Sequence, residues 1–129
     1  MTFKFHGSVC SDLEDIKIFI KNVLDKLKTI IEDEDLMFDL RLILNELIIN
    51  GVIHGNKYNR RKCVDLYLEI IENTIRIEVR DQGQGIDFDV ESYNPEELKV
   101  CGRGLVIVNG LSDEMYIQDN SIVAVKYMV

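Results

Sequence analysis

Apolar residues recur at helical spacing near the N-terminus, with lysines and acidic residues between them. The residues on this apolar face are Ile16, Ile20, Val23, Leu24, Leu27, Ile30 and Ile31. Ser11 and Glu14 match a capping box at the start of such a helix. We therefore expect an amphipathic helix over about residues 11–32. Phe3 and Phe5 alternate with polar residues and predict a short strand before it.

A second helical stretch, residues 34–54, is apolar on almost every side. Gly55 and Asn56 follow it and supply a stop signal. A helix with so little polar surface is expected to be largely buried. The polar side chains in its second half, which include Glu46 and Asn50, are therefore expected to face a cleft or a buried partner.

Alternation with a period of two begins at residue 64 and predicts a β-hairpin. Apolar and polar residues alternate over residues 64–71 and again over residues 75–81. Glu72 and Asn73 lie between the two runs and supply the turn. Residues 82–101, which follow the hairpin, show no regular period.

The end of the chain reads as a short helix followed by a second hairpin. The helix is expected over about residues 105–111, and the hairpin over residues 115–117 and 122–129 with its turn at 119–120. The order of elements predicts one α+β domain over residues 1–129. We expect a two-layer sandwich in which the helices cover one face of a mostly antiparallel mixed sheet.

The composition is that of a folded protein with an acidic surface. Fifteen basic residues against 23 acidic residues give a formal net charge of −8. This charge argues against nucleic-acid binding, which depends on neutralising many phosphates, but a small phosphate ligand needs only a few local donors. The sequence contains no signal-peptide pattern and no run near the ~20 apolar residues of a membrane span, so we expect a cytoplasmic protein without membrane contact.

The cysteines are odd in number and lie far apart. Cys10, Cys63 and Cys101 form no Cys-x-x-Cys pair, and their spacing to the two histidines does not suit zinc. We therefore expect them to remain reduced, as is usual inside a cell.

Glu46 and Asn50 lie four residues apart, so their side chains share one face of the second predicted helix, and His54 extends the same stripe. On an isolated helix such a stripe is ordinary solvent-exposed surface. On an apolar helix an unpaired carboxylate is costly, and a magnesium ion with a nucleotide would satisfy it. The Asn50 oxygen suits magnesium, and Glu46 can orient water or accept a proton. His54 fits either a supporting role or a packed structural one.

The first of two glycine-rich segments follows the second strand of the predicted hairpin. It reads Asp-Gln-Gly-Gln-Gly from Asp81 to Gly85. Gly83 and Gly85 allow close backbone approach to a ligand, and Asp81 can accept a hydrogen bond from an exocyclic amino group. A plain turn explains the same residues equally well.

The second glycine-rich segment, residues 102–105, opens the short helix near the C-terminus. Backbone N–H groups at a helix start, together with Arg103, suit a bound phosphate. The segment is neither a P-loop nor a dinucleotide-binding fingerprint. Residues 86–101, which lie between the two glycine-rich segments, are numerous enough to form a functional lid.

The stretches at residues 46–55, 81–85 and 102–105 resemble, in this order, the N, G1 and G2 boxes of the Bergerat-fold ATPases. The His-Gly pair of the first stretch, the Gly-Arg-Gly-Leu of the third and a later Asp-Glu at 113–114 look most like the anti-sigma-factor serine kinases of that superfamily. The resemblance spans about residues 11–128. It implies the Bergerat sandwich, with ATP and Mg²⁺ as the ligands.

The resemblance also implies a role for each matching residue. Asn50 would ligate magnesium, and Glu46 would act as general base or water positioner. Asp81 would read the adenine amino group, with Gly83 and Gly85 shaping that pocket. The residues that would wrap the phosphates are Gly102, Arg103, Gly104 and Leu105.

Two positions depart from the family pattern. Gly51 stands where the family usually has alanine after the magnesium-binding asparagine. Residues 120–122 occupy the place of a Gly-Thr pair whose threonine supports the adenine pocket, and Ser121 still supplies a hydroxyl there.

Two functions fit these observations, and a third is disfavoured by them. The resemblance implies a protein serine/threonine kinase that phosphorylates a STAS-type anti-anti-sigma factor and sequesters a sigma factor when this antagonist is absent. The chain has no room for the phosphoacceptor helices of a histidine kinase. A second reading is a non-catalytic switch, in which ATP binding creates a protein-docking surface. A third, an interaction domain that has lost the nucleotide, conflicts with the presence of Glu46, Asn50 and Asp81. A homodimer is expected only through the resemblance.

Overall fold

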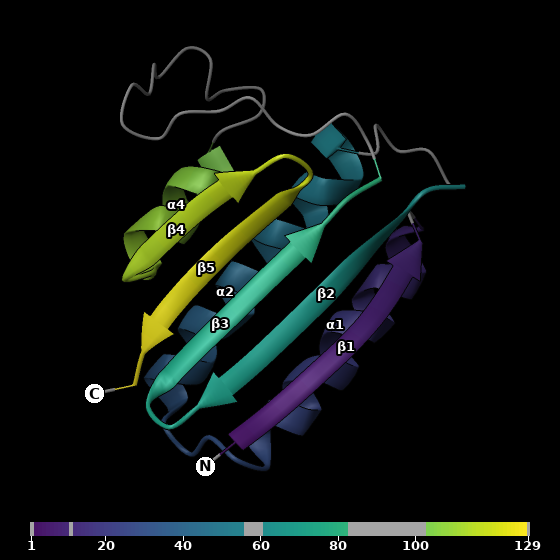
Figure 1. Cartoon of the computed structure of the whole chain (residues 1–129). Coiled ribbons are helices and arrows are strands. Elements are labelled where there is room, and N and C mark those ends of the chain that lie inside the picture. Colours follow the sequence, from purple (N-terminus) through teal and green to yellow (C-terminus); the bar gives the residue numbers. More distant parts are fainter. Residues whose placement is uncertain (1, 11, 56–60, 83–102, 129) are drawn as a thin grey trace.

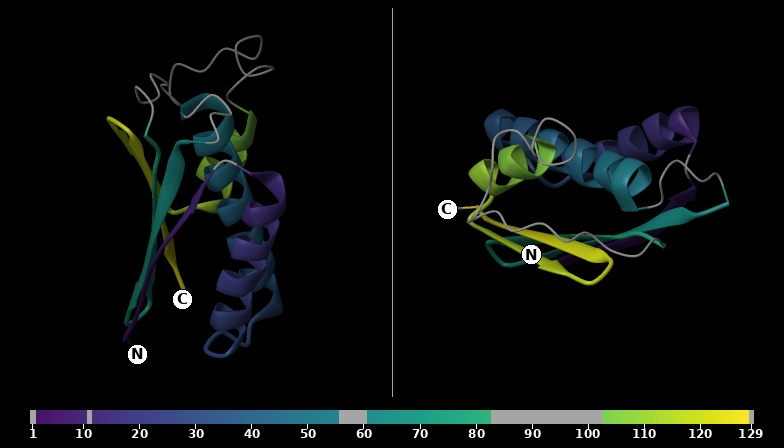
Figure 2. Two further views of the ribbon diagram at one scale, coloured as in Figure 1. Left: turned by 90° about the vertical axis from the view of Figure 1, so that its right-hand side faces the viewer. Right: turned by 90° about the horizontal axis from the view of Figure 1, so that it is seen from above.

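The fold consists of a five-stranded sheet and a layer of helices that covers one of its faces (Figure 1, Figure 2). The computed structural model describes residues 2–10, 12–55, 61–82 and 103–128, and all of their side chains except those of residues 54, 55 and 103. The strands are β1 (Thr2–Cys10), β2 (Cys63–Ile71), β3 (Thr74–Arg80), β4 (Glu114–Gln118) and β5 (Ser121–Tyr127). They pair in the order β1-β2-β3-β5-β4, and each of these pairings is antiparallel.

The helix layer consists of α1 (Leu13–Lys28), α2 (Glu34–Asn50), the π-helical segment η1 (Gly51–Gly55) and α4 (Arg103–Leu111). The two views of Figure 2 show these helices on the same side of the sheet. The expected α+β two-layer sandwich is therefore confirmed. Among the described residues, no helix has the length and apolar character needed to cross a bilayer.

The first strand is longer than the expected residues 2–5, because β1 pairs with β2 over its whole length. Gly7 lies inside this strand. In the structure, a Cβ at Gly7 would lie 2.8 Å from the Phe5 ring and 2.9 Å from the Phe19 ring. Glycine at this position therefore makes room for the aromatic pair that joins β1 to α1.

The ends of α1 differ from the expected residues 11 and 32. Asp12 caps the helix, since its Oδ1 accepts hydrogen bonds from the backbone N–H groups of Glu14 (3.0 Å) and Asp15 (3.2 Å). The helix ends at Lys28, and Thr29 Oγ1 donates to the Lys26 carbonyl oxygen at 2.7 Å. The proposed cap Ser11 lies outside the described residues.

The core lies between the sheet and the helix layer. It is formed by the apolar stripe of α1, by nearly all of α2 and by the inward-facing residues of β2 and β3. Leu40, Ile43, Leu44 and Leu47 of α2 are fully buried, which confirms the prediction that this helix is largely enclosed. Burial of that helix determines the direction in which its few polar residues can point.

Cys10 and Cys63 form a disulfide, contrary to the expectation that the cysteines remain reduced. The two residues are 53 positions apart in the chain, but they lie directly opposite each other where β1 pairs with β2. The pairing of β1 with β2 brings the two cysteines together, despite the long sequence separation that argued against a bridge. Cys101 lies outside the described residues.

Candidate functional site

Glu46 and Asn50 lie on the last turns of α2, where the helix reaches one end of the sheet (Figure 1). Glu46 is partly buried and Asn50 is 5% exposed. Their neighbours Leu47 and Ile48 are fully buried, so the helix cannot rotate to expose a different face. The first turn of the helix is fixed by Asp33, whose Oδ1 accepts hydrogen bonds from two backbone N–H groups.

The expected helix over residues 34–54 changes type directly after Asn50. Gly51–Gly55 form the π-helical segment η1 instead of continuing the α-helix. Single π-helical turns inside or after α-helices are frequent at functional sites. Sequence periodicity cannot distinguish the two helix types over so short a segment. The side chain of His54 lies outside the description, so its role remains a prediction.

The first turn of α4 lies directly against Glu46. A Cβ at Gly104 would overlap the Glu46 carboxylate and would lie 3.5 Å from the Glu46 Cβ. Leu105 and Val108, both fully buried, anchor α4 in the core beside α2. The structure therefore brings the second glycine-rich segment to the acidic residue of the second helix.

Lys126 of β5 links α4 to α2, a contact that sequence reasoning missed. Its Nζ donates a hydrogen bond to the Leu111 carbonyl oxygen (2.7 Å) at the end of α4 and lies 3.3 Å from Asp39 Oδ2 on α2. The Lys126 side chain is only 18% exposed, so this contact is partly sheltered from water. It fixes the position of α4 beside α2, and no sequence pattern relates these three segments.

Asp81 follows β3 immediately and is 5% exposed. Its backbone N–H donates to the Asn120 carbonyl oxygen at 2.9 Å and so extends the pairing of β3 with β5 by one residue. A Cβ at Gly51, the residue after Asn50, would lie 3.7 Å from the Cβ of Asp81. The ends of α2 and β3 are therefore in direct contact.

Packing explains why Gly51 departs from the family pattern, in which alanine usually follows the asparagine. A Cβ at this position would lie 2.8 Å from Cγ1 of Val64, a residue of β2 that is 1% exposed. The valine methyl group thus occupies the space that an alanine side chain would need. The two positions complement each other across the helix–sheet interface.

Ser121 lies on the other face of the sheet from the helices. It is the register partner of Arg80, and its Oγ accepts a hydrogen bond from Arg80 Nε at 3.1 Å. Because side chains alternate along a strand, Arg80 and Asp81 point to opposite faces. A role for the Ser121 hydroxyl in nucleotide binding remains a prediction.

Gln82 has a structural role that the sequence did not suggest. Its side-chain Oε1 accepts a hydrogen bond from the backbone N–H of Cys63 at 2.6 Å, so it connects the segment after Asp81 to the first residue of β2. The other predicted ligand-binding glycines, Gly83, Gly85 and Gly102, lie outside the described residues, as does the side chain of Arg103.

The chemistry of the described donors fits a magnesium ion. The site offers one carboxylate, from Glu46, and one carboxamide, from Asn50, and magnesium prefers oxygen ligands of these kinds. The Glu46 carboxylate occupies the space that a Cβ at Gly104 would fill. Among the described residues, no group of three or more His, Cys, Asp or Glu side chains gathers into an all-protein metal cluster. A metal bound here would therefore share its coordination with ligand oxygens or water.

The family model of the histidine kinase-like ATPase domain matches residues 11–126. The chain belongs to this family. The serine-protein kinases RsbW from Staphylococcus aureus strains JH9 and Newman are 28% identical to it over an alignment of 98 residues, with a coverage of 68% of this chain and 62% of the relative. RsbW from strain MSSA476 is 26% identical with the same coverage. The match thus spans 62% of the length of these curated relatives.

Membership in the histidine kinase-like ATPase family agrees with the resemblance to the Bergerat-fold ATPases. The residues that carried the resemblance, Glu46, Asn50, Asp81 and Gly104, all fall inside the matched region. In the structure they lie at the end of the sheet where α2 and β3 end and α4 begins.

Proposed function

We propose that this chain binds Mg-ATP at the end of the sheet where α2 meets β3 and α4. The contact between Gly104 and the Glu46 carboxylate carries this proposal, because it joins the expected phosphate-binding segment to the expected catalytic residue. The proximity of Gly51 to Asp81 supports it at the other end of the site. A nucleotide placed between α2 and the end of β3 would have its phosphates near α4 and its base near Asp81.

Each described residue has one task in this proposal. Asn50 would hold the magnesium ion, which supplies neutralisation of the phosphate charge. Asp81 would accept a hydrogen bond from the adenine amino group. The start of α4, with Arg103, Gly104 and Leu105, would donate backbone N–H groups to the phosphates.

The proposed reaction is transfer of the γ-phosphoryl group to a protein hydroxyl. The hydroxyl oxygen attacks the γ-phosphorus, its proton passes to the Glu46 carboxylate, the bond to the bridging oxygen breaks and ADP leaves. The partly buried position of Glu46 supports this role, because a sheltered carboxylate is held in place beside the reacting groups.

The expected partners belong to the same proposal. The similar proteins are named serine-protein kinases, which supports serine or threonine as the acceptor. We propose a STAS-type anti-anti-sigma factor as the protein substrate, and a sigma factor as the protein bound when the substrate is absent. A homodimer and a cytoplasmic location are part of this proposal, although the Cys10–Cys63 disulfide counts against a strongly reducing compartment.

Calorimetric titration with Mg-ATP tests the binding step. Asp81→Asn should weaken ATP binding by about 1–3 kcal/mol, because it replaces a charged carboxylate acceptor for the adenine amino group with a weaker neutral one and adds an amide donor beside it. Asp65→Asn is the matched control, since Asp65 lies on β2 and faces away from the helices. If the wild-type chain binds no Mg-ATP, or if Asp81→Asn binds as tightly as wild type, the proposed site is wrong.

A phosphotransfer assay with an antagonist encoded nearby tests the chemical step. Glu46→Gln should retain Mg-ATP binding and lose phosphotransfer, because the amide cannot accept the proton. Asn45→Ala is the control, because Asn45 precedes Glu46 on the helix but points toward a different face. Binding of ATP by the wild type without any transfer would support the non-catalytic switch instead.

A further inference from the structure

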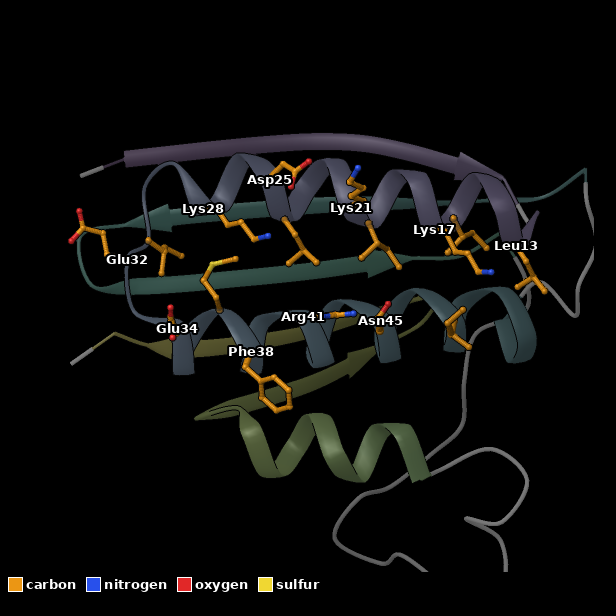
Figure 3. Close-up of a pocket in the computed structure, with 16 residues that line it drawn as sticks. Leu13, Lys17, Lys21, Asp25, Lys28, Glu32, Glu34, Phe38, Arg41 and Asn45 are labelled. Carbon is orange, nitrogen blue, oxygen red and sulfur yellow. The ribbon is translucent and has the colours of Figure 1, made fainter.

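A groove runs along the outer side of the helix layer, between α1 and α2 (Figure 3). It has a volume of about 1020 Å³. Its walls come from both helices, and its apolar lining includes the partly buried residues Leu24, Met37 and Ile49. The groove uses a different face of α2 from the one that carries Glu46 and Asn50, so it is separate from the proposed nucleotide site.

Two large apolar side chains at the edge of this groove are exposed to solvent. Leu13 of α1 is 55% exposed and Phe38 of α2 is 60% exposed. Scattered exposed apolar residues are ordinary, but exposed residues beside an apolar groove indicate a surface that binds another molecule. We call these two residues and the apolar lining of the groove the apolar strip; Figure 3 shows Phe38 at its edge, on the side of α2 that faces α4.

Cationic side chains flank the apolar strip on both helices. Figure 3 shows Lys17 and Lys28 reaching from α1 toward α2, with Arg41 on the opposite wall. Among the residues that the structure describes, Lys17 pairs with Glu14 at 3.6 Å on the surface, and Lys28 and Arg41 form no ion pair. The lining also includes Lys21 and Asp25, so four basic side chains face three acidic ones (Asp25, Glu32 and Glu34) in the groove of a chain whose formal net charge is −8.

We propose that this groove binds one amphipathic helix of a partner protein, with its apolar face on the strip and acidic residues beside Lys17, Lys28 and Arg41. Two antiparallel helices leave a groove into which a third helix packs at about 8–10 Å from each. The 16 residues of α1 extend about 24 Å, which accommodates about four turns of a partner helix. The bound helix would lie over α1 and α2, on the outer side of the helix layer.

The charges favour an acidic helix over two other occupants. Glu32 and Glu34 lie at one end of the groove, where they would repel an anionic membrane surface, whereas a membrane-binding face is usually basic throughout. Two copies of this chain meeting groove to groove would bring the same lysines and arginine together. A partner helix avoids both conflicts when its acidic residues lie beside the cations and a basic residue lies near Glu32 and Glu34.

The test uses the whole chain and two synthetic helical peptides of about 18 residues. Both peptides carry leucines at helical spacing, and one has glutamates beside the leucine stripe where the other has lysines. Fluorescence anisotropy should show the acidic peptide binding at least about tenfold more tightly than the basic one. Equal binding of the two peptides, or no binding of the acidic peptide, would overturn the proposal.

Variants then locate the binding surface. Lys17→Glu combined with Arg41→Glu should weaken the acidic peptide about tenfold or more, whereas Lys4→Glu on the opposite face of the sheet should not. Phe38→Ala should weaken it as well, whereas Ile18→Ala is the matched apolar control, because Ile18 is 59% exposed on α1 but does not line the groove. Equal effects of the groove variants and their controls would contradict the assignment.

Further measurements separate this surface from the nucleotide site and from the other occupants. Glu46→Gln should bind the acidic peptide as the wild type does, so a failed kinase assay would leave this test intact. Thermal unfolding of each variant checks that it is folded.

Binding to phosphatidylglycerol vesicles in place of the peptide would assign the groove to a membrane. A doubled mass in light scattering that Phe38→Ala abolishes would assign it to a second copy. Either result would overturn the partner helix.

Discussion

The backbone of Gly104 lies against the carboxylate of Glu46, so that even a Cβ at Gly104 would overlap it. Glu46 belongs to a buried helix in the N-terminal half of the chain, and Gly104 to the first turn of a short helix near the C-terminus. Their contact is where the helix layer brings the acidic residue and the glycine-rich segment together. The position of the carboxylate therefore depends on a residue that has no side chain.

Gly104→Ala should reduce phosphotransfer more than it reduces stability. The added methyl group meets the flexible end of Glu46, which can turn away at little energetic cost. The carboxylate then leaves the position that we propose for it beside the phosphates. We expect at least about a tenfold loss in turnover, since small displacements of catalytic groups reduce rates strongly. Phosphotransfer and thermal unfolding are measured on the same preparation.

Gly110→Ala is the control for this substitution, because Gly110 lies in the same helix and a Cβ there would meet nothing within 4 Å. It should leave turnover unchanged and raise stability by up to about 1 kcal/mol through helix propensity. Equal turnover in the two variants would show that Gly104 does not position Glu46.

Gly51→Ala should destabilise the protein by about 1–3 kcal/mol, because the new methyl group would lie 2.8 Å from Val64 Cγ1. Val64→Ala alone should also destabilise it, by leaving a cavity. The double variant should be more stable than the sum of the single effects predicts, since each change relieves the other. Urea unfolding of the four proteins measures this coupling, and strict additivity would contradict the packing explanation.

Reduction of the Cys10–Cys63 disulfide should lower the stability of the protein. The bond closes a loop across 53 positions of the chain, and by chain entropy such a loop contributes about 4 kcal/mol at most. Thermal unfolding with and without dithiothreitol should therefore differ, and Cys63→Ser should remove that difference. Cys101→Ser is the control and should leave the sensitivity to reductant unchanged.

The pKa of Glu114 should lie below the ordinary value of a glutamate. A hydrogen bond from Tyr116 at 2.6 Å and one from Tyr127 stabilise its charged form and lower its pKa. The same bonds to Glu114 raise the pKa values of both tyrosines. Because the pKa of Glu114 is lower in the folded than in the unfolded protein, its charged form stabilises the fold at pH values above the unfolded pKa. This stabilisation is lost as the pH falls through the folded pKa. The raised tyrosine pKa values contribute stability at neutral pH that is lost as the pH rises through them.

Carboxyl NMR titration of the combined variant Tyr116→Phe and Tyr127→Phe checks this assignment. The pKa of Glu114 should rise toward its ordinary value, because both donors are gone. Tyr67→Phe is the control, since Tyr67 stacks on His6 in another part of the sheet. An unchanged titration of Glu114 in the combined variant would show that the tyrosines do not set its pKa.

The sequence by itself determined the elements that depend on local periodicity. The apolar stripe of α1, the enclosed character of α2 and the two hairpins follow from which residues lie three, four or two positions apart. The resemblance identified Glu46, Asn50, Asp81 and the glycine-rich segments because those residues are close together within each motif. The family match over residues 11–126 agrees with the resemblance itself, and the roles of these residues stay predictions.

Only the tertiary structure decided the relationships between distant segments. The full length of β1 and the bond between Cys10 and Cys63 arise from pairing with a strand that follows much later in the chain. The fit of Gly51 to Val64 and the contact of Gly104 with Glu46 depend on how the helices pack on the sheet and on each other. Periodicity reports which face of an element is apolar, but not which residue of another element fills the space beside it.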